Sequence, residues 1–384
     1  MKNNNKRSIT ATVVILALII AIFIGIKNQS NNNDVTITAM FPMTGGLASY
    51  GDVASKSSTL AVEEINANGG INGKTLKLNL QDHKCDAKEA VAIYKQFKSK
   101  TNVFSGIACS GTALAVAPML ENDGKIFFDT TVTTPKLSGI SKNLFRNWSS
   151  DAKEAEIFAK LLQGVNYQKI GIIYEQTDYA KGLKDSISSD ILANDSSKQV
   201  FAEGYETGTT DVRSQLTKLQ AEGVDVIFIS PQTVTTGEIV VKQMTELKFK
   251  PRVILVNDNI IKSEPLLKKY PDFFQGAYGA DYKIADSNAI EDFKAKYQKR
   301  FGEDCPQINI GLAQYDAIKL IGQSLSATQK DGYNSQKIQE YLKNVNYQGV
   351  SGNISFDNKN DRVNTNYTLL RVDNGVALNI EATK

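Results

Sequence analysis

Cysteine and histidine, the residues that most often hold metals, are scarce in this chain. Its 384 residues include three cysteines and a single histidine, His83. Cys85, Cys109 and Cys305 lack the short paired spacings of zinc and redox motifs, and one histidine excludes a multi-histidine site. We therefore expect neither a metal nor a cofactor.

The chain also lacks an excess of charge of one sign. Four of its 44 lysines and arginines precede the first acid, Asp34, so 40 bases face 41 acids in the remainder. Such a balance offers no basic surface to a phosphate backbone. We expect no nucleic-acid partner.

Nucleophilic catalysis is not favoured either. Ser110 follows an expected strand, but a serine needs a positioned base to become a nucleophile. His83 lies at the end of a different expected strand, beside Lys84, where we expect a solvated loop. We predict no catalytic residues and expect that the protein is not an enzyme.

Long apolar runs are absent except at the N-terminus. Residues 9–26 are uncharged and largely apolar, and as a helix they would span about 27 Å, close to the thickness of the hydrocarbon core. The preceding bases, Lys2, Lys6 and Arg7, favour an inside N-terminus and an exported body. Neither a small-residue cleavage site nor a lipid-accepting cysteine follows, so we expect an uncleaved anchor and tether over residues 1–33; cleavage and release to the periplasm is the alternative.

In the remaining sequence, short β-branched segments alternate with longer amphipathic segments. β-branched runs such as VTITAMF and KTLKLNLQD are separated by longer amphipathic runs, and a similar cycle from KIGIIYE to RVILVN follows Trp148. This pattern predicts an α/β fold with two doubly wound parallel-sheet lobes. Two predicted helices begin with an acid pair at capping-box spacing, Asp86 with Glu89 and Asp151 with Glu154.

Hydroxyl-bearing segments follow two of the expected strands in the first unit. In IACSGTA, Ser110 and the next amides would give a carboxylate several hydrogen bonds, although a simple N-cap would look the same. The threonines of FDTTVTTP can donate and accept hydrogen bonds, although polar loops at strand ends are common. The glycine-rich PMTGGLASYG, residues 42–51, suits either an approaching anion or a plain tight turn.

Two further residues lie just past strands of the second unit, where open α/β sheets place ligands. They are Tyr179, in IYEQTDYAKG, and Asp258, in LVNDNI. Alone, Asp258 is more typical of a turn or a helix cap.

Export makes a disulfide plausible. A bond between Cys85 and Cys109 would close a loop that is worth roughly 3.5 kcal/mol by the chain-entropy estimate. Cys305 would then remain unpaired, and we expect it to be buried.

Taken together, these segments resemble the periplasmic leucine/isoleucine/valine-binding proteins, the type I solute-binding family of amino-acid ABC importers. The resemblance runs from residue 35 to about residue 373, and its most specific pieces are GGLASYGD, VEEINANGGINGK, DHKCDAKEAV, ACSGT, TTPKL and DYAKGL. It implies a three-crossing hinge near Trp148, Tyr282 and Gly352. Lobe 1 would comprise residues 34–149 and 283–351, and lobe 2 residues 150–282 and 352–384.

The resemblance also implies a ligand site. Ser110 and Thr133 would hold the ligand carboxylate, and the Thr131 carbonyl would take the ammonium. Tyr50 and Tyr179 would cover the ligand from opposite lobes, and the family's disulfide would fall on Cys85 and Cys109.

Two positions depart from the family pattern. Asp258 stands where the family uses a glutamate for the ammonium, and Gln232 stands where the branched-chain binders have a tyrosine. The general amino-acid interpretation survives these changes, but they do not support leucine-like specificity.

The function that we expect is therefore capture of an amino acid for the permease subunits of an ABC importer, outside the cell membrane. Two alternatives remain open at this point. One is a ligand-sensing module that acts through a partner, and the other is a binder of another small carboxylate or amide.

Overall fold

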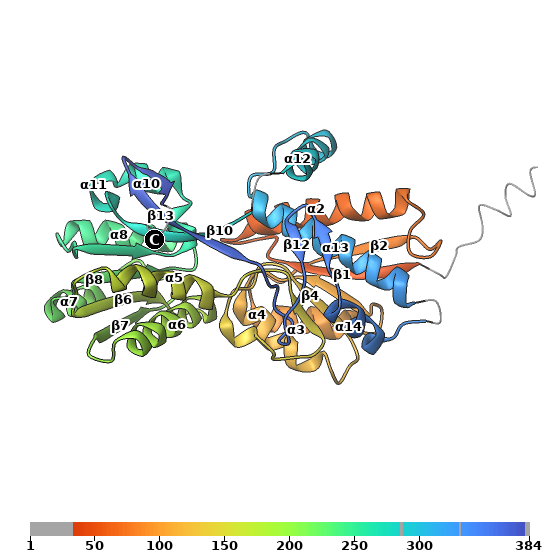
Figure 1. The fold of residues 1–384 in the computed structure, drawn as a ribbon, viewed down its shortest axis with the longest axis horizontal. Coiled ribbons are helices and arrows are strands. Elements are labelled where there is room, and N and C mark those ends of the chain that lie inside the picture. The colour runs from red at the N-terminus through yellow and green to blue at the C-terminus, as the bar shows by residue number, and fades with distance from the viewer. Residues whose placement is uncertain (1–33, 285–286, 330–331, 381–384) are drawn as a thin grey trace, which may run out of the picture.

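The computed structural model describes residues 34–284, 287–329 and 332–380. The expected anchor and tether, residues 1–33, lie outside the described residues. Within the described ranges, no helix is long and apolar enough to cross a membrane. The chain forms two α/β lobes, each built on its own sheet (Figure 1).

The sheet of the first lobe is entirely parallel. Its strand order is β2-β1-β3-β4-β5, and β1 lies between β2 and β3 because the connection from β2 passes over the sheet. This arrangement confirms the α/β fold with parallel sheets. The strands are β1 (Val35–Phe41), β2 (Leu76–Asp82), β3 (Val103–Gly106), β4 (Ile126–Asp129) and β5 (Leu144–Arg146).

Helices from two distant parts of the sequence cover this sheet. Three follow its strands directly, α2 (Ala48–Ala67), α3 (Ala87–Phe97) and α4 (Ser110–Val116), and three come from residues 288–343, α12 (Asn288–Phe301), α13 (Ile308–Thr328) and α14 (Ser335–Lys343). The apolar α13 is buried along most of its length and packs against α2. A hairpin of β11 (Tyr347–Gly349) and β12 (Gly352–Ile354) adds Ile354 to the same core.

The second lobe has a mixed sheet with the order β14-β13-β10-β9-β8-β6-β7. Its parallel part is β6 (Lys169–Glu175), β7 (Gln199–Tyr205), β8 (Val226–Ser230), β9 (Val253–Val256) and β10 (Tyr278–Lys283), to which β13 (Asn366–Asp373) and β14 (Val376–Asn379) add antiparallel strands. The helices are α5 (Asp151–Gln163), α6 (Asp178–Asn194), α7 (Arg213–Glu222), α8 (Val234–Glu246), α9 (Asp258–Ile261), α10 (Glu264–Lys269) and α11 (Pro271–Phe274).

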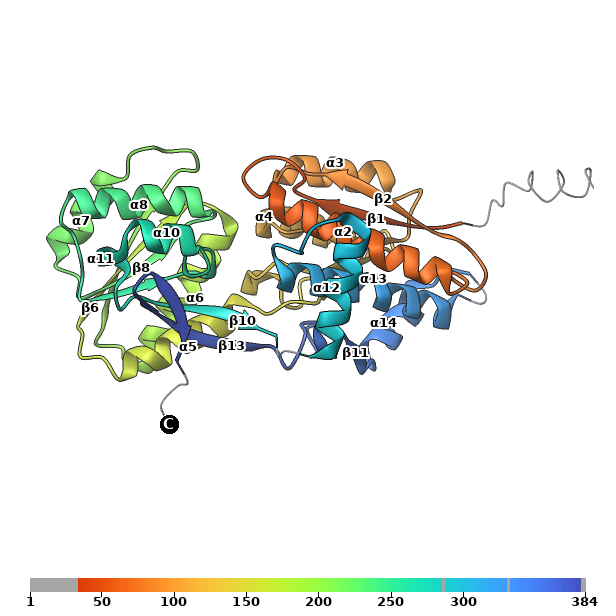
Figure 2. The ribbon, with the colours of Figure 1, turned by 90° about the horizontal axis from the view of Figure 1, so that it is seen from above.

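The chain passes between the lobes three times. The first passage joins β5 to α5, and the second follows β10; Figure 2 shows β10 and its antiparallel partner β13 extending together from the second lobe toward the first. The third passage comes later than the expected Gly352, because Gly352 pairs within the hairpin and Asp361 is still held beside β5. Residues 352–361 therefore pack with the first lobe.

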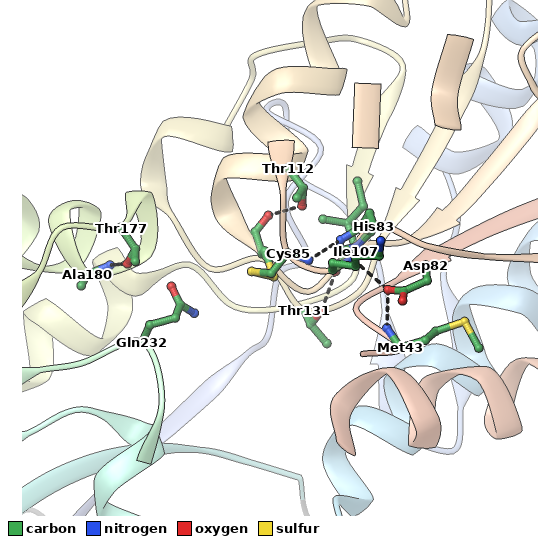
Figure 3. Close-up of a disulfide and its surroundings, with 12 residues drawn as sticks. Met43, Asp82, His83, Cys85, Ile107, Thr112, Thr131, Thr177, Ala180 and Gln232 are labelled. Carbon is green, nitrogen blue, oxygen red and sulfur yellow. Dashed lines mark hydrogen bonds between the residues drawn. A yellow bond between two sulfur atoms is a disulfide. The ribbon is translucent and has the colours of Figure 1, made fainter. Parts of the chain in front are cut away.

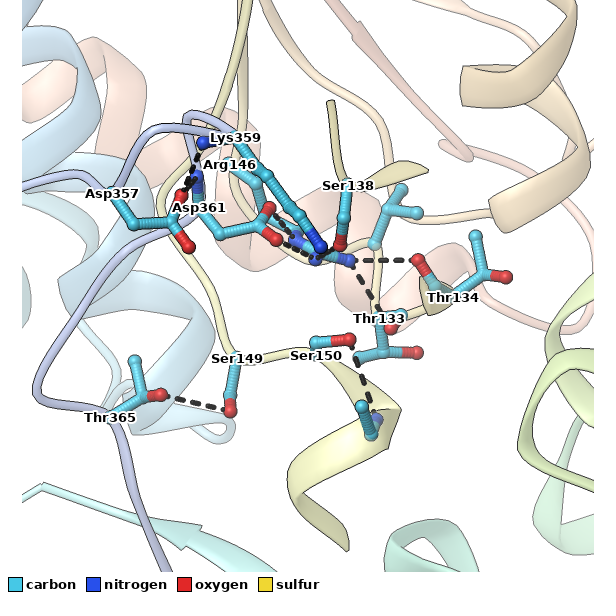
Figure 4. A network of polar contacts seen from close by, with 12 residues as sticks. Thr133, Thr134, Ser138, Arg146, Ser149, Ser150, Asp357, Lys359, Asp361 and Thr365 are labelled. Carbon is cyan, nitrogen blue, oxygen red and sulfur yellow. Dashed lines mark hydrogen bonds and ion pairs between the residues drawn. The ribbon is translucent and has the colours of Figure 1, made fainter. Parts of the chain in front are cut away.

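A buried arginine at the end of β5 holds that late segment. Arg146 is fully buried and pairs with both carboxylate oxygens of Asp361, at 2.8 Å from Nε and 2.7 Å from a terminal nitrogen (Figure 4). The same guanidinium donates to the carbonyl of Thr134 at 2.8 Å and to the Ser138 hydroxyl at 2.7 Å. One side chain thus fixes both the third passage and the threonine-rich loop.

The predicted disulfide is confirmed between Cys85 and Cys109 (Figure 3). It links the turn after β2 to the residue before α4, whereas Cys305 is unpaired and partly rather than fully buried. The expectation of a solvated His83 was wrong. Its side chain is buried and its Nδ1 accepts a hydrogen bond from the Cys85 amide at 3.1 Å, and burial lowers the pKa of His83 to about 4.

Candidate ligand-binding site

A cavity of about 490 Å³ lies between the two lobes. It is placed where the parallel strands of the two sheets end, as expected for open α/β sheets. Every side chain that the sequence analysis proposed for the ligand lines this cavity: Tyr50, Ser110, Thr131, Thr133, Tyr179, Gln232 and Asp258.

The first lobe contributes hydroxyl groups and a carbonyl. Ser110 is the first residue of α4, and the N-cap is Cys109, so the simple capping role considered for Ser110 does not apply. Thr131 donates its own hydroxyl to the Ile107 carbonyl at 2.5 Å, and no described group donates to the Thr131 carbonyl. That carbonyl therefore remains an available acceptor beside the cavity.

The backbone of Thr133 is fixed from two sides. Its carbonyl accepts from the Asp151 amide at 2.8 Å and from Arg146 at 3.3 Å. Figure 4 shows how the loop carrying Thr133 and Thr134 wraps against the Arg146 guanidinium. The position of this part of the wall is set by buried contacts rather than by a ligand.

The second lobe contributes a tyrosine and a carboxylate in direct contact. Asp258 begins α9, and Asn257 serves as the N-cap by accepting from the Ile260 amide at 3.3 Å. Asp258 is therefore not a cap. The Tyr179 hydroxyl donates to Asp258 Oδ1 at 2.8 Å and accepts from Asn257 Nδ2 at 3.2 Å.

Two charged residues that the sequence analysis missed also line the cavity. Lys262 Nζ lies 2.8 Å from Asp258 Oδ2 and 3.3 Å from Asp281 Oδ1. The four-residue spacing of Asp258 and Lys262 on a helix was a usable signal for the first pair. Asp281 lies on β10, and no sequence pattern indicates that it is close to Asp258 or Lys262.

These contacts control the charge of the cavity. Burial opposes ionisation of Asp258, but the charge of Lys262 and hydrogen bonds from Lys262 and Tyr179 outweigh it and lower the pKa. Burial likewise works against the charge of Lys262, but Asp258 and Asp281 reverse this and hold its pKa well above the ordinary value. Burial raises the pKa of Asp281.

Two more acids are buried behind this group, in the first turn of α5. Asp151 and Glu154 are each 1% exposed, and neither oxygen of Asp151 has a hydrogen-bond partner among the described residues. The capping box predicted here was wrong, because Ser150 is the cap. Burial, with the nearby charge of Asp258, raises the pKa of Asp151 to about 8 and that of Glu154 well above its ordinary value.

The lobes touch each other across the cavity. The Tyr50 hydroxyl, on α2, donates to Asn259 Oδ1 at 2.9 Å, and Asn259 Nδ2 donates to the Gln232 carbonyl at 3.1 Å. Figure 3 shows the Gln232 side chain projecting from the second lobe toward the first. At the crossings, the Trp148 and Tyr282 rings pack with centroids 4.9 Å apart.

Comparisons with known proteins agree with this architecture. Residues 34–377 match the profile of the family described as periplasmic binding protein. The chain is 28% identical over 370 residues to an amino acid binding protein of Pseudomonas aeruginosa, covering 94% of this chain and 95% of the relative. It is 26% identical over 352 residues to the Leu/Ile/Val-binding protein of Escherichia coli K12, covering 88% and 91%.

A solved structure shows the same fold. The crystal structure of a leucine binding protein from Thermotoga maritima has a TM-score of 0.76 at 21% identity, covering 90% of this chain and 98% of that one. Because the family profile spans nearly all of the described residues and the two-lobed fold accompanies it, this chain belongs to the periplasmic binding protein family.

Proposed function

We propose that this protein captures an amino acid between its two lobes, outside the cytoplasmic membrane, and delivers it to the permease subunits of an ABC importer. Two relatives that align with most of the chain are described as an amino acid binding protein and as a Leu/Ile/Val-binding protein. The observation that carries the proposal is the pairing, within one cavity, of Ser110 and Thr133 on one wall with Asp258 on the other.

This arrangement matches the two charges of an amino acid. A charged group that leaves water loses several kcal/mol unless partners replace the solvent. The Ser110 and Thr133 hydroxyls supply donors for a carboxylate, and the Thr131 carbonyl and Asp258 supply acceptors for an ammonium. Each oxygen of Asp258 already accepts one hydrogen bond, but a carboxylate offers about four acceptor sites, so capacity for the ligand remains.

The charge balance supports the same assignment. When both carboxylates are ionised, the group of Asp258, Lys262 and Asp281 carries one net negative charge. A ligand ammonium would neutralise it. The ligand would then favour the closed state of the two lobes, in which Tyr50 is hydrogen-bonded to Asn259 across the cavity.

Isothermal titration calorimetry tests this proposal. The purified protein, unfolded and refolded to remove any retained ligand, is titrated with the common amino acids, and at least one should bind. Asp258→Asn keeps the shape of the side chain but removes its charge, and it should weaken binding by about 2 kcal/mol or more. The exposed Asp272→Asn, on α11 and outside the cavity, is the matched control and should bind normally.

Two outcomes would contradict the proposal. If none of the amino acids gives a binding signal, the ligand is not one of those tested. Unchanged affinity in Asp258→Asn would point instead to a simple carboxylate or amide that has no ammonium.

We also propose that residues 9–26 hold the protein on the outer face of the membrane. Support comes from the sequence, an apolar run behind three bases. Membrane fractionation of cells expressing the full chain should leave the protein in the membrane pellet with its original N-terminus. A soluble mature protein that has lost this segment would contradict the anchor while leaving ligand capture untouched.

A further inference from the structure

We propose that the crossing end of the cavity, defined as Lys262, Asp281, Asn309 and Trp148, binds an uncharged polar side chain of the ligand and that Lys262 sets this preference. The inference rests on the proposed capture of an amino acid. It adds the class of amino acid, one with a hydroxyl or carboxamide side chain.

Four cavity-lining residues meet where the chain crosses between lobes. Lys262 lies 3.3 Å from Asp281 on β10, and the carbonyl of the next residue, Tyr282, accepts from Asn309 Nδ2 at 3.0 Å. Trp148 packs on the Tyr282 ring. The crossing end thus combines residues of both lobes, because Asn309 lies on α13 of the first lobe and Lys262 follows α9 in the second, and both line the cavity.

One of the three N–H donors of the Lys262 ammonium has no acceptor among the described residues. An ammonium donates three, and Asp258 and Asp281 take two of them. No further acceptor for Lys262 occurs in the described part of the chain, although 37% of the side chain is exposed and it lines the cavity. A ligand atom with a lone pair would complete its coordination.

Acceptors for a ligand donor lie on the opposite wall. The side-chain amide nitrogen of Asn309 donates to the Tyr282 carbonyl, and that of Gln307 donates to the Ser49 hydroxyl at 3.1 Å. Within the described ranges the side-chain oxygens of both residues accept nothing, and both residues line the cavity. A side chain that both donates and accepts, such as a hydroxyl or a carboxamide, would match this set.

Charge argues against an acidic or a basic side chain. The ligand ammonium already balances the single net negative charge of Asp258, Lys262 and Asp281. A second ligand carboxylate would add an uncompensated negative charge close to Asp258 and Asp281. A ligand cation would be repelled by Lys262.

An aliphatic side chain fits poorly for a different reason. It would displace water from Lys262 and Asn309 without replacing the hydrogen bonds, and buried polar groups left unpaired reject such ligands more strongly than a missing methylene does.

Competition calorimetry with pairs of amino acids that have similar shapes tests the inference. Threonine is compared with valine, and asparagine with leucine and aspartate, on the wild-type protein and on Lys262→Met. The wild type should bind the uncharged polar member of each pair at least about tenfold more tightly. In Lys262→Met the ratio of the affinity for threonine to that for valine, and of the affinity for asparagine to that for leucine, should fall to within about threefold of unity. This expectation holds whether or not the absolute affinities change.

The controls separate the possible failures. Lys160→Met, exposed on α5, should keep the wild-type ratios, and thermal melting checks that each variant is folded. Equal or tighter binding of valine, leucine or aspartate by the wild type would overturn the inference, as would unchanged ratios in Lys262→Met, while amino-acid capture itself would stand. Failure of every amino acid to bind would overturn the proposed function and this inference with it.

Discussion

Replacing the buried Asp151 with asparagine should stabilise the protein at neutral pH. The carboxylate is 1% exposed and neither oxygen has a partner in hydrogen-bonding geometry among the described residues. Burial raises its pKa to about 8 in the folded state, and the neighbouring Thr133 hydroxyl and the charge of Arg146 offset this only in part. The unfolded chain would titrate near the ordinary value of 3.8. Between these two values the folded protein binds the proton and the unfolded chain does not, so folding becomes less favourable as pH rises.

The size of the effect follows from the two pKa values. Each pH unit between them costs about 1.4 kcal/mol, so the penalty from Asp151 is on the order of 2 kcal/mol at pH 5 and on the order of 5 kcal/mol at pH 7.5. Asparagine does not titrate. The advantage of Asp151→Asn over the wild type should therefore grow by on the order of 3 kcal/mol between these two pH values.

Urea denaturation of both proteins at about pH 5 and about pH 7.5 measures this difference. Comparing variant with wild type at each pH cancels the titration of carboxyl groups that do not interact with Asp151, including those whose pKa values are lowered. Glu156→Gln, exposed on the same helix, is the control and should show a difference that does not change with pH. A stability difference between Asp151→Asn and the wild type that stays the same at both pH values would contradict this prediction, because it would mean that Asp151 titrates alike in the folded and unfolded states.

Three further outcomes follow from the described contacts. Arg146→Met should cost about 3 to 5 kcal/mol of stability, because it leaves the Asp361 carboxylate without its buried partner; urea denaturation measures it, and a loss below 1 kcal/mol would contradict the role. Serine at both Cys85 and Cys109 should lower the unfolding free energy by roughly 3.5 kcal/mol, and a variant as stable as the wild type would count against this. Tyr179→Phe removes the donor to Asp258 and should weaken amino-acid binding about tenfold by calorimetry, whereas unchanged affinity would mean that this bond does not support the ligand site.

Local patterns predicted the elements well because they depend on nearby residues. Alternating β-branched runs and amphipathic runs indicate strands and helices wherever they are placed in space. Asp86 caps α3 as its spacing indicated, accepting from the amides of Lys88 and Glu89. At α5 the same signal failed because Ser150 is the N-cap, and Asp151 is buried in the first turn of the helix.

The cavity residues were predictable for a topological reason. Parallel strands all end at one edge of a sheet, so polar residues such as Ser110 and Tyr179 that follow strands gather there although they are distant in sequence. Asp281 was missed because it lies within β10 and reaches Lys262 only through the folding of the sheet. His83 and the late third passage after Asp361 also depended on burial that no local pattern encodes.

A crystal structure of the protein with its amino-acid ligand would show directly whether the two walls of the cavity hold the two charged ends of that ligand. We expect the ligand carboxylate to lie within hydrogen-bonding distance of Ser110 and Thr133 and the ammonium to contact Asp258. A ligand bound elsewhere, or one in this cavity with its carboxylate against Asp258, would contradict it.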